Sequence, residues 1–131
     1  MSYFHSITVK SPSIEQLREK VEGALKSEGF GVLTEIDVQA TMKKKLDKDY
    51  APYLILGACN PVFADKVLSA EPHIGVLLPC NVTIRQLDAG NFEVAMMNPG
   101  AAMSAVQNPA IEPLANEVGE KLQRALDLIE A

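Results

Sequence analysis

The fold class is decided by the stretch from residue 80 to residue 97, which reads CNVTIRQLDAGNFEVAMM. Apolar and polar side chains alternate on both sides of Asp88-Ala89-Gly90-Asn91, which is typical of strands with one buried face. The four central residues predict a hairpin turn, so Cys80 to Leu87 should pair antiparallel with Phe92 to Met97. We expect the first strand to begin upstream, at Ile74 to Leu78, and to be interrupted at Pro79. Proline has no N–H for the ladder, so it belongs at an edge or a bulge.

Upstream of this hairpin, the pattern switches between the strand period and the helix period. Tyr3 to Lys10 and Gly31 to Val38 alternate with a period of two and predict strands. Between them, Ser13 and Gln16 form a capping-box pattern that begins an amphipathic helix, and Gly29 ends it. The buried face of this helix is predicted to consist of Ile14, Leu17, Val21, Ala24 and Leu25.

The middle of the chain predicts one more strand and a short helix. Tyr53 to Cys59 is a nearly continuous apolar run and predicts a buried strand. Asn60-Pro61 is a cap and first-turn pair, which predicts a short helix that Pro72 ends. Its buried stripe is predicted to be Val62, Phe63, Val67 and Leu68. We expect the lysine-rich stretch from Ala40 to Asp49 to be a mobile connection, or at most a short solvated helix.

The C-terminal segment predicts a final helix that begins at Pro109 or Pro113. Its inner face is predicted to be Leu114, Val118, Leu122, Ala125 and Ile129. The element order is strand, helix, four strands with a short helical insertion, and helix. This order predicts an α+β two-layer sandwich with an antiparallel sheet. The 131 residues have room for a single domain, 1–131.

Composition excludes several partners. The chain has 17 acidic and 12 basic residues and a net charge of -5, which repels a phosphate backbone, so nucleic acid is not expected as a partner. We expect no membrane association, because no window approaches the ~18 apolar residues of a membrane span. The first ten residues lack the pattern of a signal peptide, and we expect a cytoplasmic protein.

The two cysteines are the first candidates for chemistry, since no common enzyme motif occurs. Cys59 ends a predicted strand just before a helix, where the positive field of the helix favours a reactive thiolate. Cys80 shares the strand parity of Val82 and Ile84, which favours a buried core residue. A disulfide between the two thiols should be absent or transient in a reducing cytoplasm.

A metal site is the second candidate. Glu35 and Asp37 share one face of a predicted strand, roughly 7 Å apart, and could supply two oxygen ligands. Together with Cys59, Cys80 and His73 they form a set that could satisfy zinc or another transition metal.

Simpler readings remain open for these residues. Acidic side chains are mostly solvated, and His5 fits a core histidine. Met96, Met97 and Met103, with the thiols, suit monovalent copper but equally fit core packing.

Three runs in the chain, in this order, resemble the family called domain of unknown function 302. They are residues 29–39, GFGVLTEIDVQ, residues 56–61, LGACNP, and residues 74–81, IGVLLPCN. The resemblance implies a fold similar to one half of the TATA-box-binding protein, and a homodimer, but no reaction. The positions that match the family pattern are Glu35, Asp37, Cys59, Asn60, Pro61, Pro79, Cys80 and Asn81.

Two functional hypotheses follow, and a third reading is purely structural. The first is a homodimeric module that binds a metal ion or a small ligand through Glu35, Asp37 and the two cysteines, supported by the Asn60 and Asn81 amides. The alternative is a thiol redox or sulfur-transfer protein, with Cys59 as the thiolate and Cys80 as the second thiol. In the structural reading, Asn60, Pro61 and Pro79 only shape turns.

Overall fold

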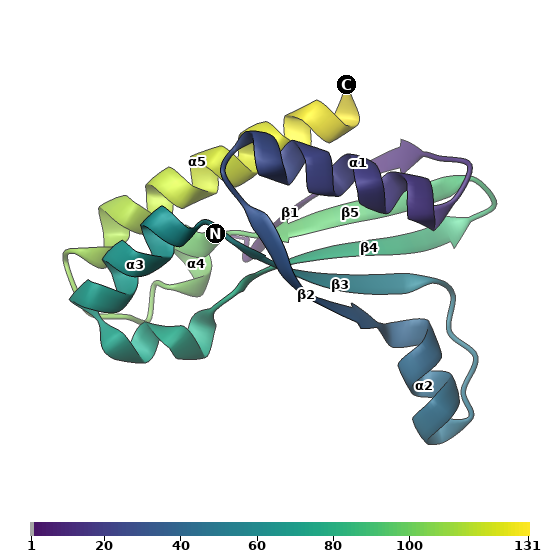
Figure 1. Ribbon diagram of the computed structural model, residues 1–131, viewed down its shortest axis with the longest axis horizontal. Helices are drawn as coiled ribbons and strands as arrows, with labels where there is room; N and C mark the ends of the chain where they lie inside the picture. The colour runs from purple at the N-terminus through teal and green to yellow at the C-terminus, as the bar shows by residue number, and fades with distance from the viewer. Residues whose placement is uncertain (1) are drawn as a thin grey trace.

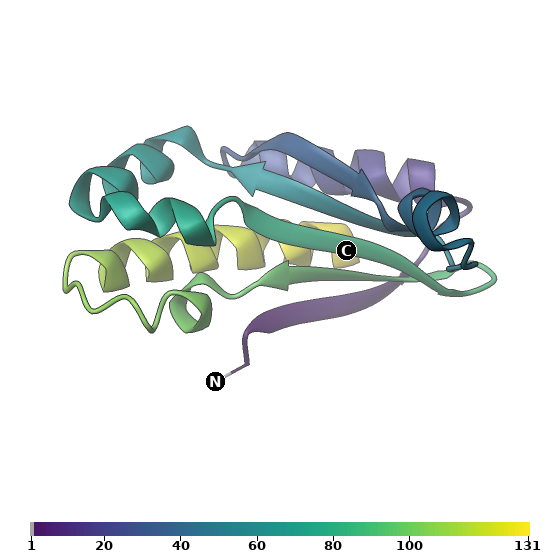
Figure 2. The same cartoon turned by 90° about the horizontal axis from the view of Figure 1, so that it is seen from below.

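The computed structural model describes residues 2–131 and has two layers (Figure 1). A five-stranded antiparallel sheet, in the order β1-β5-β4-β3-β2, forms one layer, and helices α1 and α5 cover one of its faces (Figures 1 and 2). The strands are β1 Phe4–Lys10, β2 Gly31–Asp37, β3 Tyr53–Cys59, β4 Cys80–Asp88 and β5 Asn91–Met97. The helices are α1 Ile14–Ser27, α2 Val38–Leu46, α3 Pro61–Ala70, the 3₁₀ helix η1 Pro72–Leu77, α4 Pro99–Ala102 and α5 Ile111–Glu130. The predicted α+β sandwich with an antiparallel sheet is confirmed.

Helix α1 begins and ends where its sequence pattern predicts. The Ser13 side chain accepts a hydrogen bond from the N–H of Gln16, and Gly29 follows the helix with a φ of 86° that favours glycine. Four of the five predicted apolar positions are buried: Leu17, Val21, Ala24 and Leu25. The long C-terminal helix α5 likewise turns Val118, Leu122, Ala125 and Ile129 inward, as predicted.

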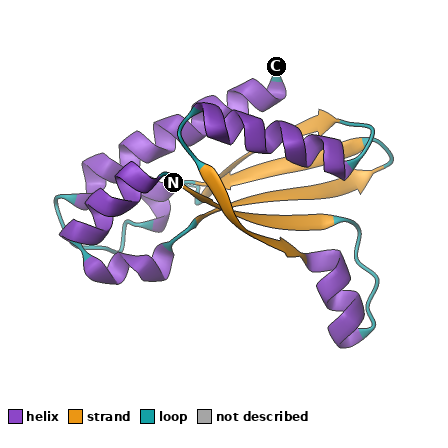
Figure 3. Cartoon of the chain, viewed as in Figure 1, coloured by secondary structure: helices purple, strands orange, loops and turns teal. Residues whose placement is uncertain are grey.

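Two hydrophobic clusters fill the interior. The larger one, the main core, lies between α1, α5 and the covered face of the sheet. The smaller one, the end cluster, consists of Val67, Ile74, Met103, Ile111 and Ala115. It is built by α3, η1, α4 and the start of α5, which gather beyond one end of the sheet (Figure 3). Helix α2 lies beyond the opposite end of the sheet, where it contacts β2 and β3 (Figure 1).

The structure decides two stretches that the sequence left short or uncertain, and the first of these expectations was wrong. Residues Ile74 to Leu78 are not a strand: Pro72–Leu77 forms η1, and β4 begins only at Cys80, after Pro79. A short apolar run fits a strand and a buried helical turn equally well, and Pro72 stands at the first position of this one. For Ala40 to Asp49, the short solvated helix is correct and the mobile connection is wrong: most of the stretch belongs to α2, which buries no residue. The Asp37 carboxylate caps this helix by accepting from the N–H of Ala40.

The predicted stripe of α3 is only half correct. Phe63 and Val67 are buried, whereas Val62 and Leu68 are 62% and 39% exposed. The helix is only ten residues long and contacts its neighbours along one narrow line, so the flanking apolar residues reach solvent.

Candidate functional site

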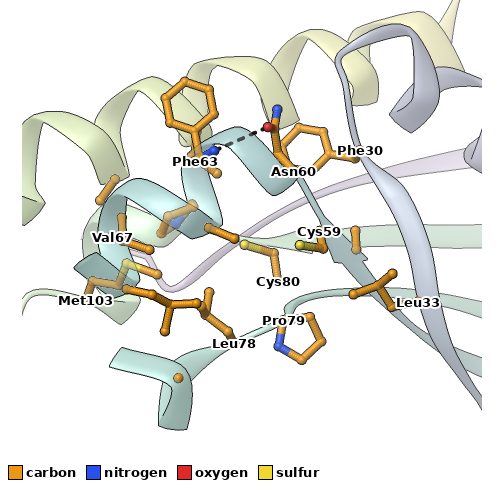
Figure 4. Close-up of a pocket in the computed structure, with 17 residues that line it drawn as sticks. Phe30, Leu33, Cys59, Asn60, Phe63, Val67, Leu78, Pro79, Cys80 and Met103 are labelled. Carbon is orange, nitrogen blue, oxygen red and sulfur yellow. Dashed lines mark hydrogen bonds between the residues drawn. The ribbon is translucent and has the colours of Figure 1, made fainter. Parts of the chain in front are cut away.

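A cavity of about 300 Å³ lies where the main core meets the end cluster (Figure 4). We call it the thiol pocket. Its walls come from the start of β2, the end of β3, helix α3, the stretch from η1 to the start of β4, helix α4 with the residue after it, and the first half of α5. Its lining residues are Phe30, Leu33, Ala58, Cys59, Asn60, Phe63, Ala64, Val67, Leu68, Gly75, Leu78, Pro79, Cys80, Pro99, Met103, Ala115 and Val118.

The wall of the thiol pocket consists almost entirely of carbon and sulfur. None of the 17 lining residues is charged, and Asn60 is the one with a side-chain amide. Both ends of that amide are occupied: Oδ1 accepts from the N–H of Phe63 at 3.4 Å, and Nδ2 donates to the carbonyl of Glu28 at 3.3 Å. Asn60 therefore caps α3, as the sequence predicts, and holds it against the end of α1.

The two cysteines enter the pocket from adjacent strands. Cys59 ends β3, and Cys80 begins β4, where it pairs with Ala58. Figure 4 shows both sulfur atoms directed into the same space, and both thiols are free. Cys59 is partly exposed, whereas Cys80 is buried at 5% exposure. The sequence thus predicts correctly that Cys80 is a buried residue on the core face.

Burial separates the chemistry of the two thiols. It raises the pKa of Cys80 to about 11, and the neighbouring Cys59 contributes to this increase. Cys80 therefore remains a neutral thiol at neutral pH, which an apolar wall requires, while Cys59 is the thiol that solvent and ligands can reach.

Glu35 and Asp37 share one face of β2, but they do not lie beside the cysteines. In the strand register they pair with Leu56 and Leu54, whereas Cys59 pairs with Gly31. Cys59 is therefore three strand positions, roughly 10 Å, from the level of Glu35 and five positions, roughly 17 Å, from that of Asp37. Their side chains also have other partners. Glu35 accepts from Arg18 Nε at 2.8 Å, an ion pair that raises the pKa of Arg18, and Asp37 caps α2.

The remaining predicted site residues lie apart from the pocket as well. His73 is 96% exposed and lies 3.8 Å from Glu71. Asn81 is exposed at the uncovered face of the sheet. His5 is exposed, not in the core as expected, because it lies on the edge strand β1.

The predicted metal sets are not assembled. Among residues 2–131, no three His, Cys, Asp or Glu side chains are placed to hold a metal ion, so Glu35, Asp37, His73, Cys59 and Cys80 form no zinc site. Of the three methionines in the copper hypothesis, only Met103 lines the thiol pocket, and Met96 packs in the main core.

Most of the pocket wall is not apparent from the sequence. Ala64, Gly75 and Ala115 line it, and their small side chains leave the space that larger ones would fill. The available signal was the presence of alanine on the inward faces of two helices, but a small inward residue equally indicates close helix packing.

Comparison with known proteins gives a match over nearly the whole chain. The family model described as Domain of unknown function DUF302 matches residues 5–129. The chain is also similar to the crystal structure of an uncharacterized conserved protein DUF302 from Bacillus stearothermophilus, with 28% sequence identity and a TM-score of 0.89. That similarity covers 98% of this chain and 99% of the other. No curated protein matches the chain. Across the described residues, no helix is both long and apolar enough to span a membrane.

Proposed function

We propose that this chain, which belongs to the DUF302 family, binds an uncharged and largely apolar small molecule in the thiol pocket. One observation carries the proposal: a cavity of about 300 Å³ whose wall offers carbon, sulfur and no charge. Its volume falls at the lower end of the ~300–1,000 Å³ of small-molecule sites, which are also mainly apolar. The sequence predicts a metal ion or a small ligand, and the apolar wall of the pocket favours the small ligand.

The wall also restricts the chemistry of the ligand. A charged group inside the pocket would lose its hydration and meet no opposite charge, because the lining residues carry none. An apolar molecule gains free energy by leaving water and by contacting Phe30, Met103 and Val118. We therefore expect the pocket to select ligands by their size and apolarity. Besides the Asn60 amide, which is already hydrogen-bonded, the polar side-chain groups of the wall are the two free thiols.

Fluorescence titration with N-phenyl-1-naphthylamine, an uncharged apolar probe, tests the proposal. We expect saturable binding that Ala64→Leu weakens, because Ala64 lines the pocket and a larger side chain fills it. The matched control is Ala70→Leu, since Ala70 is on the same helix but exposed. Circular dichroism confirms that both variants fold. Failure of the probe to bind the wild-type chain, or equal weakening by both variants, would contradict the proposal.

A second candidate function is thiol redox or sulfur transfer. Its support is that two free thiols line one pocket. The raised pKa of Cys80 keeps this thiol protonated, which makes Cys59 the attacking thiol and Cys80 the slow partner. Oxidation with diamide should then remove two hydrogen atoms from the intact mass, through a bond between Cys59 and Cys80. Formation of only intermolecular disulfides would exclude this candidate.

The homodimer implied by the family resemblance stays a prediction. Native mass spectrometry of the untagged chain reports the number of copies together with any bound molecule. A single copy at micromolar concentration would contradict the prediction, without affecting the proposal for the pocket.

A further inference from the structure

We propose that Cys59 is a covalent attachment site for apolar electrophiles, specifically uncharged α,β-unsaturated carbonyl compounds that enter the thiol pocket. This inference rests on the proposed function and specifies the class of molecule that the same pocket takes. It also assigns different roles to the two thiols.

The first argument is that only sulfur is available in the wall to recognise a reactive atom of the ligand. No lining residue is charged, and the Asn60 amide is already bonded at both ends, to Phe63 and to Glu28. A ligand held by carbon contacts alone would meet the two thiols as the only side-chain groups with chemistry to offer. A soft sulfur nucleophile suits a soft electrophilic carbon.

The second argument concerns access. Cys59 is partly exposed at the end of β3, beside the exposed Leu33 side chain, so an incoming molecule can reach its sulfur atom. Cys80 lies at 5% exposure and carries a raised pKa of about 11, so it remains a protonated thiol that lines the pocket without attacking. The two sulfur atoms share the cavity (Figure 4), but only Cys59 is accessible enough to act as the nucleophile.

The reaction needs no additional reagent. The Cys59 thiolate adds to the β-carbon of the unsaturated carbonyl compound, so a carbon–sulfur bond forms while the carbon–carbon π bond breaks. The electron pair moves to the α-carbon, which takes one proton, in balance with the proton that the Cys59 thiol released. Nothing leaves, and nothing is oxidised or reduced. The apolar wall contributes by concentrating an apolar reagent beside the sulfur atom.

A pair of maleimides that differ in charge tests the inference. N-phenylmaleimide is uncharged and apolar, whereas 6-maleimidohexanoate carries a carboxylate. Each rate on the native wild-type chain is divided by the rate of the same reagent with glutathione. We expect the normalised rate of N-phenylmaleimide to exceed that of the charged reagent by about tenfold or more. Peptide mapping of the wild-type adduct should locate it on Cys59.

Two variants connect the rate to the pocket. Ala64→Leu should slow N-phenylmaleimide and leave the charged reagent unchanged, while the exposed control Ala70→Leu should change neither rate. Cys59→Ser should abolish the adduct, because Cys80, the other thiol in the pocket wall, is buried.

The outcomes separate this inference from the proposed function. If the fluorescent probe binds but both maleimides react in the ratio seen with glutathione, or the adduct lies on Cys80, the covalent role of Cys59 is wrong and the binding function stands. If the probe does not bind and the rates show no preference, both are wrong. A preference for N-phenylmaleimide that Ala64→Leu removes supports both.

Discussion

The main core and the end cluster are built from different kinds of segments, and the pocket lies between them. The main core joins five strands to two helices of 14 and 20 residues, and it buries Val21, Leu25 and Val82 to 0% exposure. The end cluster joins helices of ten, six and four residues to the start of α5, and it buries five residues. The long helices α1 and α5 pack against the sheet over several turns, whereas each short helix of the end cluster makes few contacts. Unfilled volume, and with it the candidate site, is found at the boundary between the two.

The largest expected effect tests whether the main core provides most of the stability. Leu25→Ala removes a fully buried side chain of α1 and should lower the free energy of unfolding by about 4 kcal/mol. Leu78→Ala, at the already open pocket, should cost about 1 kcal/mol, because that side chain is only partly buried. Urea unfolding measures both, and equal losses would remove the distinction between the regions.

The next effect tests the connection between the two regions. A Cβ on Gly57 would overlap Thr34 Oγ1 and stand 2.7 Å from Pro79 Cγ, so Gly57→Ala should cost about 3 kcal/mol. Thr34 belongs to the neighbouring strand β2, and Pro79 lines the pocket. The matched control is Gly31→Ala, where a Cβ meets nothing within 4 Å. Thermal unfolding compares the two, and a tolerated Gly57→Ala would mean that the wall formed by Pro79 can move.

A smaller effect concerns the proton on Cys80. Burial raises its pKa from 9.0 to about 11, so the folded chain keeps a proton that the unfolded chain loses. Its contribution to stability is fully present below about pH 9 and is lost as the pH rises through about 11, a change of roughly 2–3 kcal/mol. Unfolding free energies measured across this range should fall more steeply for the wild type than for Cys80→Ala. Parallel curves would show that the Cys80 site is more hydrated than its burial indicates.

The smallest effect tests the cap that joins α3 to the end of α1. Asn60→Ala should cost about 1 kcal/mol, because it removes the bonds to the Phe63 N–H and the Glu28 carbonyl. Asn60→Asp keeps the acceptor for Phe63 but loses the donor to Glu28, and should recover part of the loss. Chemical denaturation measures both, and an Asp variant as unstable as the Ala variant would place the stabilisation in the bond to Glu28.

The sequence predicts the main core well because its elements are long enough to show a period. Leu17, Val21 and Leu25 recur at helical spacing, and the hairpin at Asp88 to Asn91 fixes the pairing of β4 with β5. The segments that build the end cluster are too short to show such a period in the sequence. Ile74 to Leu78 is too short for a strand to be told from a 3₁₀ turn, and the helical turn formed because Pro72 begins it.

The candidate site was only partly predictable for a geometric reason. That Glu35 and Asp37 share one face follows from the strand period, and so does the burial of Cys80. Whether Glu35 and Cys59 meet depends on the register of β2 with β3, in which Glu35 pairs with Leu56 while Cys59 pairs with Gly31 at the other end of the strand. No local pattern reveals the register, so the sequence marks the two cysteines and the two carboxylates as candidates without showing that the structure keeps them apart.

The direct passage of β2 into α2 has a consequence for how this chain behaves when it is concentrated. Strand β2 is an edge strand, and such edges are templates on which the strands of other molecules can add. Asp37 both ends the strand and caps the helix, so the open edge is limited to the seven residues of Gly31–Asp37 and is irregular at Leu33. Lys44 and Lys45 then follow in α2, and charged side chains beside the end of an edge strand disfavour the addition of another strand there. A helix that buries no residue of its own thereby helps to keep the sheet from growing beyond its five strands.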